Sequence, residues 1–284
     1  ATVTTATPLA APVTLVNATG ILIDGAGTAP VTGTATINNS GTIVAMVENN
    51  GVVDFGNAIH VENAPNAVAI NLLGGGDIFG NIEISADDAI TVSGGETSFE
   101  GIVNPDGVLE GSLAIAPDGT LYLRNDPTGS DSGDARPFIS PTVVNVDDFT
   151  MTGGATLALE LPNFEGPGLE TSYPQVFANT ADISGGVIEI RPSTLNGLYA
   201  NDYFYDNVID ANTLTGTLGP ASGVGEDGDD GVYAASILLD ASPVYDGADN
   251  VDINVNRVAF NDPRFGLTPN QAQAAGGIGN VYSP

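Results

Sequence analysis

The chain has 284 residues and contains no cysteine, no tryptophan and no lysine. Without cysteine it can form neither a disulfide nor a thiolate metal site. Its longest uninterrupted apolar run, Ile43 to Val47, is far shorter than the ~20 residues that a membrane-spanning helix needs. We therefore expect no direct membrane insertion of this segment. Aromatic residues make up only 6% of the chain, so its core must consist mainly of aliphatic side chains.

Positive charge is also scarce. Five arginines stand against 35 acidic residues, giving a net charge of −30 at pH 7, and residues 1–123 contain His60 but no arginine. Binding to nucleic acid or to an anionic membrane requires cations that replace counterions. The composition therefore excludes nucleic acid as a partner. The charge keeps a folded chain soluble, and salt or divalent cations relieve the repulsion that it causes.

Turn residues and short apolar runs are abundant. Between Asn38 and Leu123, turns rich in Asn and Gly alternate with β-branched runs such as Ile78–Ile84. This repetition without helical spacing predicts an all-β fold, a right-handed parallel β-helix with a C-terminal capping segment. Residues 13–123 would then form on the order of five to six rungs.

Five asparagines fall in or beside the expected turns. Asparagine tolerates left-handed backbone and can hydrogen-bond to the equivalent residue one rung away. We therefore expect a structural role for Asn38, Asn49, Asn57, Asn71 and Asn81.

The pattern divides the chain into five parts. An extended N-terminal arm that pairs with a sheet edge, or else a flexible terminus, is expected for residues 1–20. The remaining parts are a β-helix repeat block at 21–124, an irregular loop at 125–141, a C-terminal β-helix and cap at 142–259, and a linker stump at 260–284. Within that stump, Thr268 as N-cap and Gln271 three residues later predict a short helix that ends at Gly276-Gly277.

Three of these features resemble the autotransporters, Gram-negative proteins that carry a secreted β-helical passenger on a membrane β-barrel. The turn-and-strand units such as Asn39-Ser-Gly-Thr-Ile look like passenger repeats. The segments Phe149–Leu161 and Ala181–Ile190 resemble the C-terminal folding segment of passengers, the autochaperone region. Gly266-Leu-Thr-Pro-Asn-Gln-Ala-Gln-Ala-Ala is similar to the junction that leads to the barrel.

The resemblance implies an extracellular or cell-surface location, reached by export through the outer membrane. Because no barrel follows, it also implies a released passenger or a chain cut at that point. The start at Ala1 suggests a processed mature product, and a trimmed chain would look the same. We expect a non-enzymatic structural protein that acts in adhesion, surface coating or fibre formation, with head-to-tail self-association as its main partner interaction. Two alternatives stay open. One is a passenger hydrolase with its active site on the loops at 125–141 or 219–231, and the other is a monomeric adhesin with an unknown cell-surface ligand.

Catalytic motifs are weak. The segment Gly129–Asp134 contains Asp-Ser-Gly, but a serine nucleophile needs a base, and the only histidine, His60, lies in a strand-like run. Three Asp-Asp pairs, which we place in turns, lack the aromatic platforms typical of glycosidases. They are Asp87-Asp88, Asp147-Asp148 and Asp229-Asp230. We expect no catalytic residues and no required cofactor.

Calcium is the one cofactor for which the sequence offers ligands. Carboxylates spaced by glycines supply the hard oxygen atoms that Ca²⁺ prefers. The candidate metal ligands are Glu226, Asp227, Asp229 and Asp230, and a second acidic cluster contains Asp246, Asp249 and Asp252. The segment Gly74–Asn81 resembles at most one imperfect calcium-binding nonapeptide. The alternative to a calcium site is a solvated acidic loop.

Overall fold

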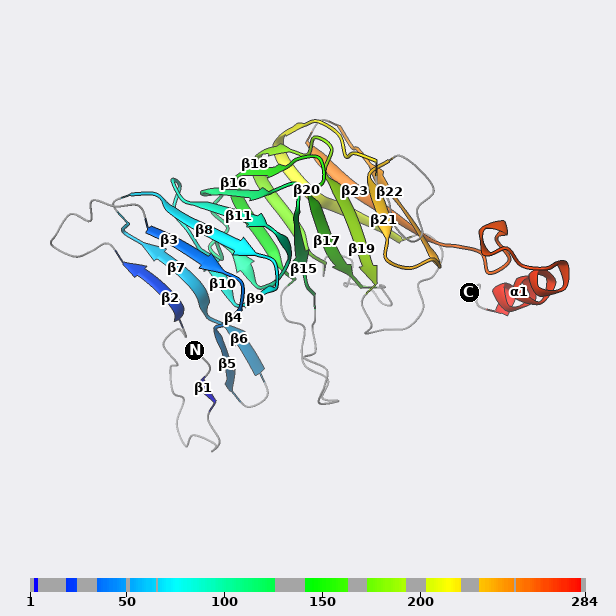
Figure 1. Cartoon of the computed structure of the whole chain (residues 1–284), viewed down its shortest axis with the longest axis horizontal. Coiled ribbons are helices and arrows are strands. Elements are labelled where there is room, and N and C mark those ends of the chain that lie inside the picture. Colours follow the sequence, from blue (N-terminus) through cyan, green and yellow to red (C-terminus); the bar gives the residue numbers. More distant parts are fainter. Residues whose placement is uncertain are drawn as a thin grey trace.

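A computed structural model describes ten stretches of the chain. They are residues 3–4, 19–24, 35–49, 52–64, 66–125, 141–162, 173–192, 203–220, 230–247 and 249–281. The structure consists mostly of strands in long parallel sheets that curl around an axis, as in a parallel β-solenoid (Figure 1).

Each turn of the solenoid passes through three faces. The first face contains β2 (Thr19–Asp24), β7 (Asn57–Glu62), β10 (Asn81–Glu83) and β13 (Ile102–Val103). The second contains β3 (Ala35–Asn39), β8 (Val68–Leu73), β11 (Ala89–Ser93) and β14 (Ser112–Ile115). Three longer strands continue both faces: β16 (Val143–Met151), β18 (Gln175–Asp182) and β20 (Tyr203–Thr215). Because β16 pairs with both β13 and β14, the two faces merge into one 13-stranded sheet.

The third face is a separate seven-stranded sheet in which all strand pairs are parallel. Its strands are β4 (Thr42–Val44), β9 (Gly76–Phe79), β12 (Gly95–Glu100), β15 (Gly119–Leu123), β17 (Thr156–Leu161), β19 (Val187–Pro192) and β21 (Val232–Ala234). Each turn contributes one strand to this sheet, so the described residues form seven turns. Strand β15 pairs directly with β17, so the sheet continues across the segment 125–141.

The expected number of rungs is wrong. Four turns, not five to six, lie between Thr19 and Leu123 in the described residues, because they contribute only β4, β9, β12 and β15 to the seven-stranded sheet. The excess arose from apolar runs that belong elsewhere. Strands β5 (Met46–Asn49) and β6 (Val52–Phe55) form an antiparallel hairpin outside the two large sheets, and β1 (Val3–Thr4) pairs in parallel with β5.

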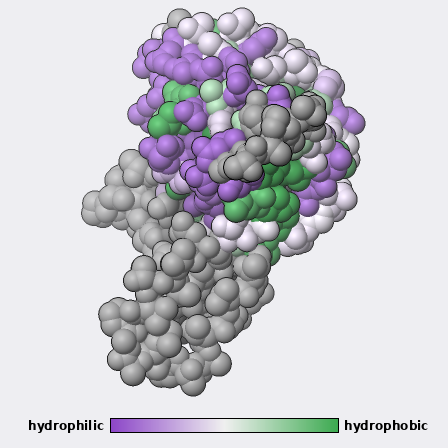
Figure 2. Space-filling view, turned by 90° about the vertical axis from the view of Figure 1, so that its left-hand side faces the viewer, coloured by the Kyte–Doolittle hydropathy of each residue, from purple (hydrophilic) through white to green (hydrophobic). Residues whose placement is uncertain are grey.

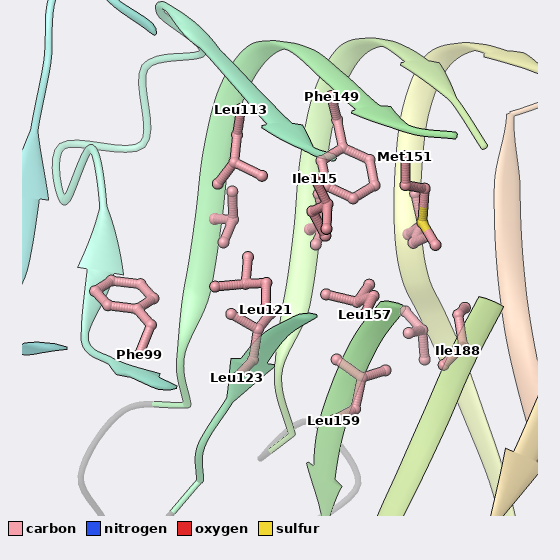
Figure 3. Packing of buried hydrophobic residues seen from close by; sticks show 14 of the residues in the cluster. Phe99, Leu113, Ile115, Leu121, Leu123, Phe149, Met151, Leu157, Leu159 and Ile188 are labelled. Atoms are coloured by element: carbon pink, nitrogen blue, oxygen red, sulfur yellow. The ribbon is translucent and has the colours of Figure 1, made fainter. Parts of the chain in front are cut away.

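The core is an aliphatic column inside the turns. Side chains alternate between buried and partly exposed along β8 and β15, which is the period of two that a strand with one buried face requires. Figure 3 shows Leu113, Phe149 and Met151 facing Leu121 and Leu157 across the interior. Close packing of Val, Ile and Leu therefore replaces the large rings that the composition lacks.

The C-terminal end of the solenoid changes to antiparallel pairing. Strand β23 (Asn250–Arg257) pairs antiparallel with β20 on one side and with β22 (Leu239–Val244) on the other. We call β22 and β23 the cap. It covers the edge that β20 would otherwise expose.

A short 3₁₀ turn, η2 (Pro263–Phe265), and the helix α1 (Pro269–Val281) follow the cap. The expected helix start is confirmed, because the Thr268 backbone N–H donates to Gln271 Oε1 over 2.9 Å. The expected end at Gly276-Gly277 is wrong, since α1 continues through both glycines. A Cβ atom on Gly276 would lie 3.2 Å from Asn261 Nδ2, so glycine allows the helix to lie close to that side chain. No helix in the described ranges has the length and apolar character needed to cross a bilayer.

The asparagine expectation is confirmed in part. Asn38 and Asn71 are register partners in β3 and β8, and Asn71 Nδ2 donates to Asn38 Oδ1 over 2.7 Å. Asn57 and Asn81 are also register partners, but Asn57 donates to Glu83 and Asn81 accepts from the Ile102 backbone N–H. The side chain of Asn49 lies outside the described part. These asparagines lie within strands rather than in turns, which still places equivalent side chains one strand spacing apart.

Candidate functional site

The outer side of the seven-stranded sheet carries a network of charged side chains. Its centre is Arg191 on β19. The Arg191 Nη2 atom lies 2.7 Å from Glu96 Oε2 and 2.8 Å from Glu189 Oε2, and Nη1 lies 3.1 Å from Glu96 Oε1. The guanidinium also lies over the Tyr122 ring, 4.3 Å from its centroid. We call Glu96, Tyr122, Glu189 and Arg191 the arginine cluster.

This cluster connects successive turns. In the sheet order, Glu96 on β12 and Arg191 on β19 are separated by β15 and β17. Burial alone would lower the pKa of Arg191, but the hydrogen bonds that its guanidinium donates to Glu96 and then to Glu189 raise it above its ordinary range. The cation therefore stays charged, and its planar fork suits the bidentate contact with Glu96.

Two tyrosines, Tyr122 in the cluster and Tyr233, which feels the charge of Glu189, are held neutral. Burial, followed by the charge of Glu160, raises the pKa of Tyr122 well above its ordinary value. Burial, followed by the charge of Glu189, raises the pKa of Tyr233 to about 12. These phenols therefore act as hydrogen-bond donors and packing groups at neutral pH rather than as bases.

An open hollow of about 370 Å³ adjoins the arginine cluster at the corner between the second and third faces. Glycines line most of it, together with Asp77, Glu96 and Ser98. A Cβ atom on Gly74 would come within 2.1 Å of the Gly94 carbonyl oxygen, so neighbouring corners stack too closely for a side chain there. Both carboxylates already have partners, because the Ser98 hydroxyl donates to Asp77 and Arg191 donates to Glu96. The hollow can offer hydrogen-bond acceptors to a small polar ligand.

A second polar constellation lies where β20 meets the cap. The sequence pointed to Asp246, Asp249 and Asp252 as an acidic cluster, and Asp206 and Asp210 on β20 act electrostatically on the same group. We call these five residues the cap carboxylates. Asp206 and Asp210 were missed because the antiparallel pairing of β20 with β23 joins segments about 40 residues apart. No local spacing pattern in the sequence predicts such a pairing.

Asp252 is the buried member of the cap carboxylates, with 2% of its surface exposed. Its Oδ1 accepts a hydrogen bond from the Asn207 backbone N–H over 2.7 Å. Burial raises the pKa of Asp252, the Asn207 hydrogen bond opposes this, and the charges of Asp206 and Asp246 raise the pKa further. Burial also raises the pKa of Asp210, followed by the charges of Asp249 and Asp206.

The candidate calcium ligands lie mostly outside the described residues. These are Glu226, Asp227 and Asp229. Asp230 is described, and its Oδ1 accepts a hydrogen bond from the Val232 backbone N–H over 3.4 Å. Across the described ranges, no three or more His, Asp or Glu side chains are arranged to hold a metal ion. The calcium site stays a prediction from the sequence.

The candidate catalytic groups are not brought together in the part of the chain that the structure describes. His60 on β7 contacts Glu83 on the neighbouring strand β10, with 3.4 Å between Nε2 and Oε2, so it is a rung side chain as expected. The segment 129–134 lies outside the described residues. Asp88 accepts from the backbone N–H groups of Val68 and Ser85, each over 2.7 Å. It therefore has a structural role.

The placement of Asp147-Asp148 in a turn is wrong, because both residues lie within β16 at the point where this strand passes from the first face to the second. Asn179 Nδ2 donates to Asp147 Oδ1 over 2.6 Å, and the Thr180 hydroxyl donates to Asp148. Both carboxylates therefore bond to the next turn of the solenoid.

Comparisons of the chain with protein-family models, with curated proteins and with solved structures found no match.

Proposed function

We propose that this chain is a non-enzymatic, secreted scaffold of the bacterial cell surface, similar to the passenger of an autotransporter and built as a right-handed β-helix. It would act in adhesion, surface coating or fibre formation. The observation that best supports this proposal is that reactive polar side chains on the flanks are bonded to the neighbouring turns. Such bonds stabilise a rod and give these side chains a structural role.

The clearest example is a ladder on three successive strands. Asn212 on β20 donates to Asn179 on β18 over 2.8 Å, and Asn179 donates to Asp147 on β16 over 2.6 Å. Each strand adds one polar side chain to the row, as the in-register pairing requires. Side-chain bonds of this kind run parallel to the backbone ladder and make the solenoid stiffer along its axis.

Self-association is supported by the sheet edges. Among the described strands, β2, β3 and β4 in the first turn each pair with one neighbour only, and β22 pairs only with β23. Leu22 on β2 is 54% exposed, and Figure 2 shows a hydrophobic patch on this end of the molecule. Unpaired strand edges are templates for pairing with another chain, and a head-to-tail contact does not close. The partner that we propose is therefore a second copy.

The test is assembly of the purified chain. We expect filaments in electron micrographs once salt or millimolar Ca²⁺ screens the repulsion between molecules of charge −30. Replacing Leu22 by Lys on the edge strand should reduce assembly, and Val108→Lys is the matched control because Val108 is 45% exposed outside the named strands. A chain that stays monomeric in light scattering under all these conditions would refute self-assembly.

A monomeric adhesin is a second candidate, which the hollow beside Glu96 favours. A glycan array would test it. Glu96→Gln should weaken glycan binding if the hollow holds the ligand. Leu22→Lys should leave glycan binding unchanged even if it reduces assembly.

A further inference from the structure

The hairpin of β5 and β6 is an insertion at one corner of the solenoid. In the second and third turns a single glycine connects the third face to the first. Gly80 lies between β9 and β10, and Gly101 lies between β12 and β13. In the first turn, residues 45–56 occupy the corresponding place between β4 and β7. The solenoid therefore does not need this hairpin to complete a turn.

The base of the hairpin is bonded to the next turn. The Ala45 backbone N–H donates to the Phe79 carbonyl oxygen over 2.8 Å, and the Asn81 backbone N–H donates to the Gly56 carbonyl oxygen over 2.8 Å. Ala45 is fully buried. From this base, β5 and β6 extend away from the two large sheets (Figure 1). The hairpin therefore starts from a fixed base and presents its strands outside the rod.

The same base shows which backbone groups of β6 face outward. The Gly56 N–H donates to the Ala45 carbonyl oxygen over 2.7 Å, and antiparallel pairs alternate between those that exchange hydrogen bonds and those that do not. Along the register of β5 and β6, Asp54 therefore bonds to β5, whereas the N–H and C=O groups of Val53 and Phe55 point away from it. Among the described strands, β6 pairs only with β5, and the other edge of β5 pairs with β1. The free edge of this small sheet is β6.

We propose that β6 pairs with β6 of a second copy of this chain, antiparallel and about a twofold axis. In this arrangement the outward groups of Val53 in one copy meet those of Phe55 in the other, and the twofold axis repeats the same bonds. The two small sheets then form one continuous sheet. Because both copies use the same strand, the contact closes at a dimer.

Two features favour a second copy as the occupant of this edge. An antiparallel edge related by a twofold axis is its own complement, so each outward donor of one copy meets an acceptor of the other. The projecting hairpins also hold the two rods apart, which reduces the repulsion between chains of charge −30. One effect opposes the contact. This register places Asp54 opposite Asp54 of the second copy, and like charges at opposite positions are destabilising. Salt should therefore strengthen the dimer.

This contact goes beyond the proposed function, because it does not use the first-turn edges that would build a filament. It would join two rods side by side through their hairpins. Loss of one contact leaves the other intact, so the two proposals can fail separately.

Sedimentation equilibrium of the full chain at high salt measures the contact. Leu22→Lys, which should reduce filament growth, should still form dimers. Adding Val53→Pro to this variant removes an outward N–H but no hydrogen bond to β5, and should weaken dimerisation about 10-fold or more. Val53→Thr is the matched control, since it keeps the N–H and suits a strand. A monomeric Leu22→Lys chain, or equal dimerisation with proline and threonine at position 53, would refute the proposal.

A second measurement does not depend on how proline affects the hairpin. The chain has no cysteine, so Asp54→Cys gives one thiol per chain. In the proposed register the two Cα atoms lie about 4.5 Å apart, within the range that a disulfide spans. Oxidation should therefore give a covalent dimer, and far less of it with Glu48→Cys on β5, whose other edge is paired with β1. Equal yields from the two variants would overturn the proposal. Dimers without filaments would support this contact and contradict the filament.

Discussion

Arg191 and Glu96 are 95 positions apart in the chain, yet the guanidinium of one makes two hydrogen bonds with the carboxylate of the other. The contact crosses β15 and β17, and the Arg191 guanidinium lies over the Tyr122 ring. In a chain with only five arginines, this contact ties four successive turns of the solenoid together.

Replacing Arg191 by Met should lower the free energy of unfolding by about 1–3 kcal/mol, because Glu96 and Glu189 would lose their shared cation. Urea denaturation measures the change. Arg264→Met is the control, since Arg264 also pairs with two carboxylates, Asp240 and Asp262, but lies beyond the cap. We expect it to cost less than about 1 kcal/mol. Equal losses in the two variants would contradict a special role for the arginine cluster.

Gly74→Ala should destabilise the chain strongly, because the added Cβ would come within 2.1 Å of the Gly94 carbonyl oxygen. Two backbones would have to move apart, and changes of this kind typically cost about 1–3 kcal/mol. Gly41→Ala is the matched control, since its Cβ would meet nothing within 4 Å. Thermal unfolding of both variants checks the prediction, and a Gly74→Ala variant as stable as Gly41→Ala would show that the corners are looser than described.

Leu157→Ala should cost about 2–5 kcal/mol, because Leu157 is fully buried in the aliphatic column and its neighbours can relax only in part. Leu238→Ala removes the same atoms from a side chain that is 39% exposed, and should cost less than about 1 kcal/mol. Chemical denaturation gives both values. Similar losses at the two positions would mean that the column is not the main source of stability.

At alkaline pH the half-buried tyrosines should ionise above the ordinary tyrosine pKa, together with unfolding of the chain. Burial, and then the charge of Asp206, raises the pKa of Tyr173 to about 12, and the pKa of Tyr233 is also raised to about 12. Stability that depends on neutral phenols is complete below the ordinary pKa of ~10 and is lost as the pH rises through the folded values. Tyrosinate absorbance followed together with circular dichroism should show these groups ionising with unfolding. Full ionisation near pH ~10 in a folded chain would contradict this.

Calcium binding at Glu226, Asp227, Asp229 and Asp230 remains a prediction from the sequence. If these carboxylates hold Ca²⁺, millimolar CaCl₂ should raise the melting temperature and EDTA should reverse the change. The double variant Asp227→Asn, Asp229→Asn should lose the response, and Asp87→Asn, Asp118→Asn is a control that removes the same charge elsewhere. A melting temperature that ignores both CaCl₂ and EDTA would exclude the site.

The sequence was informative about strands because their signal is local. Alternation along Val68–Leu73 and Gly119–Leu123 needs only neighbouring residues to decide which side chains face the core. The expectation that an asparagine bonds to its equivalent one rung away is met by Asn38 and Asn71, but the sequence did not indicate which asparagines would pair. The number of turns was overestimated because an apolar run such as Val52–Phe55 looks the same in a hairpin as in a rung.

The candidate sites depended on contacts across turns and were therefore harder to see. No pattern in the chain joins Arg191 to Glu96, and the Asn207 backbone N–H reaches Asp252 only because β23 pairs antiparallel with β20 at the cap. The expected end of the helix at Gly276-Gly277 was wrong, because glycine is compatible with a helix as well as with its end, and α1 continues to Val281.

Composition and short-range periodicity by themselves determined that this chain would be acidic, free of cysteine chemistry and made of strands with an aliphatic interior. Only the tertiary structure decided that three strands form each of the first four turns and two form each later turn, that the contact from Arg191 to Glu96 spans four strands of one sheet, and that Asp252 is buried where the parallel pairing ends. The reason is physical: strand-forming tendency belongs to adjacent residues, whereas charge pairing and burial depend on groups that only folding brings together.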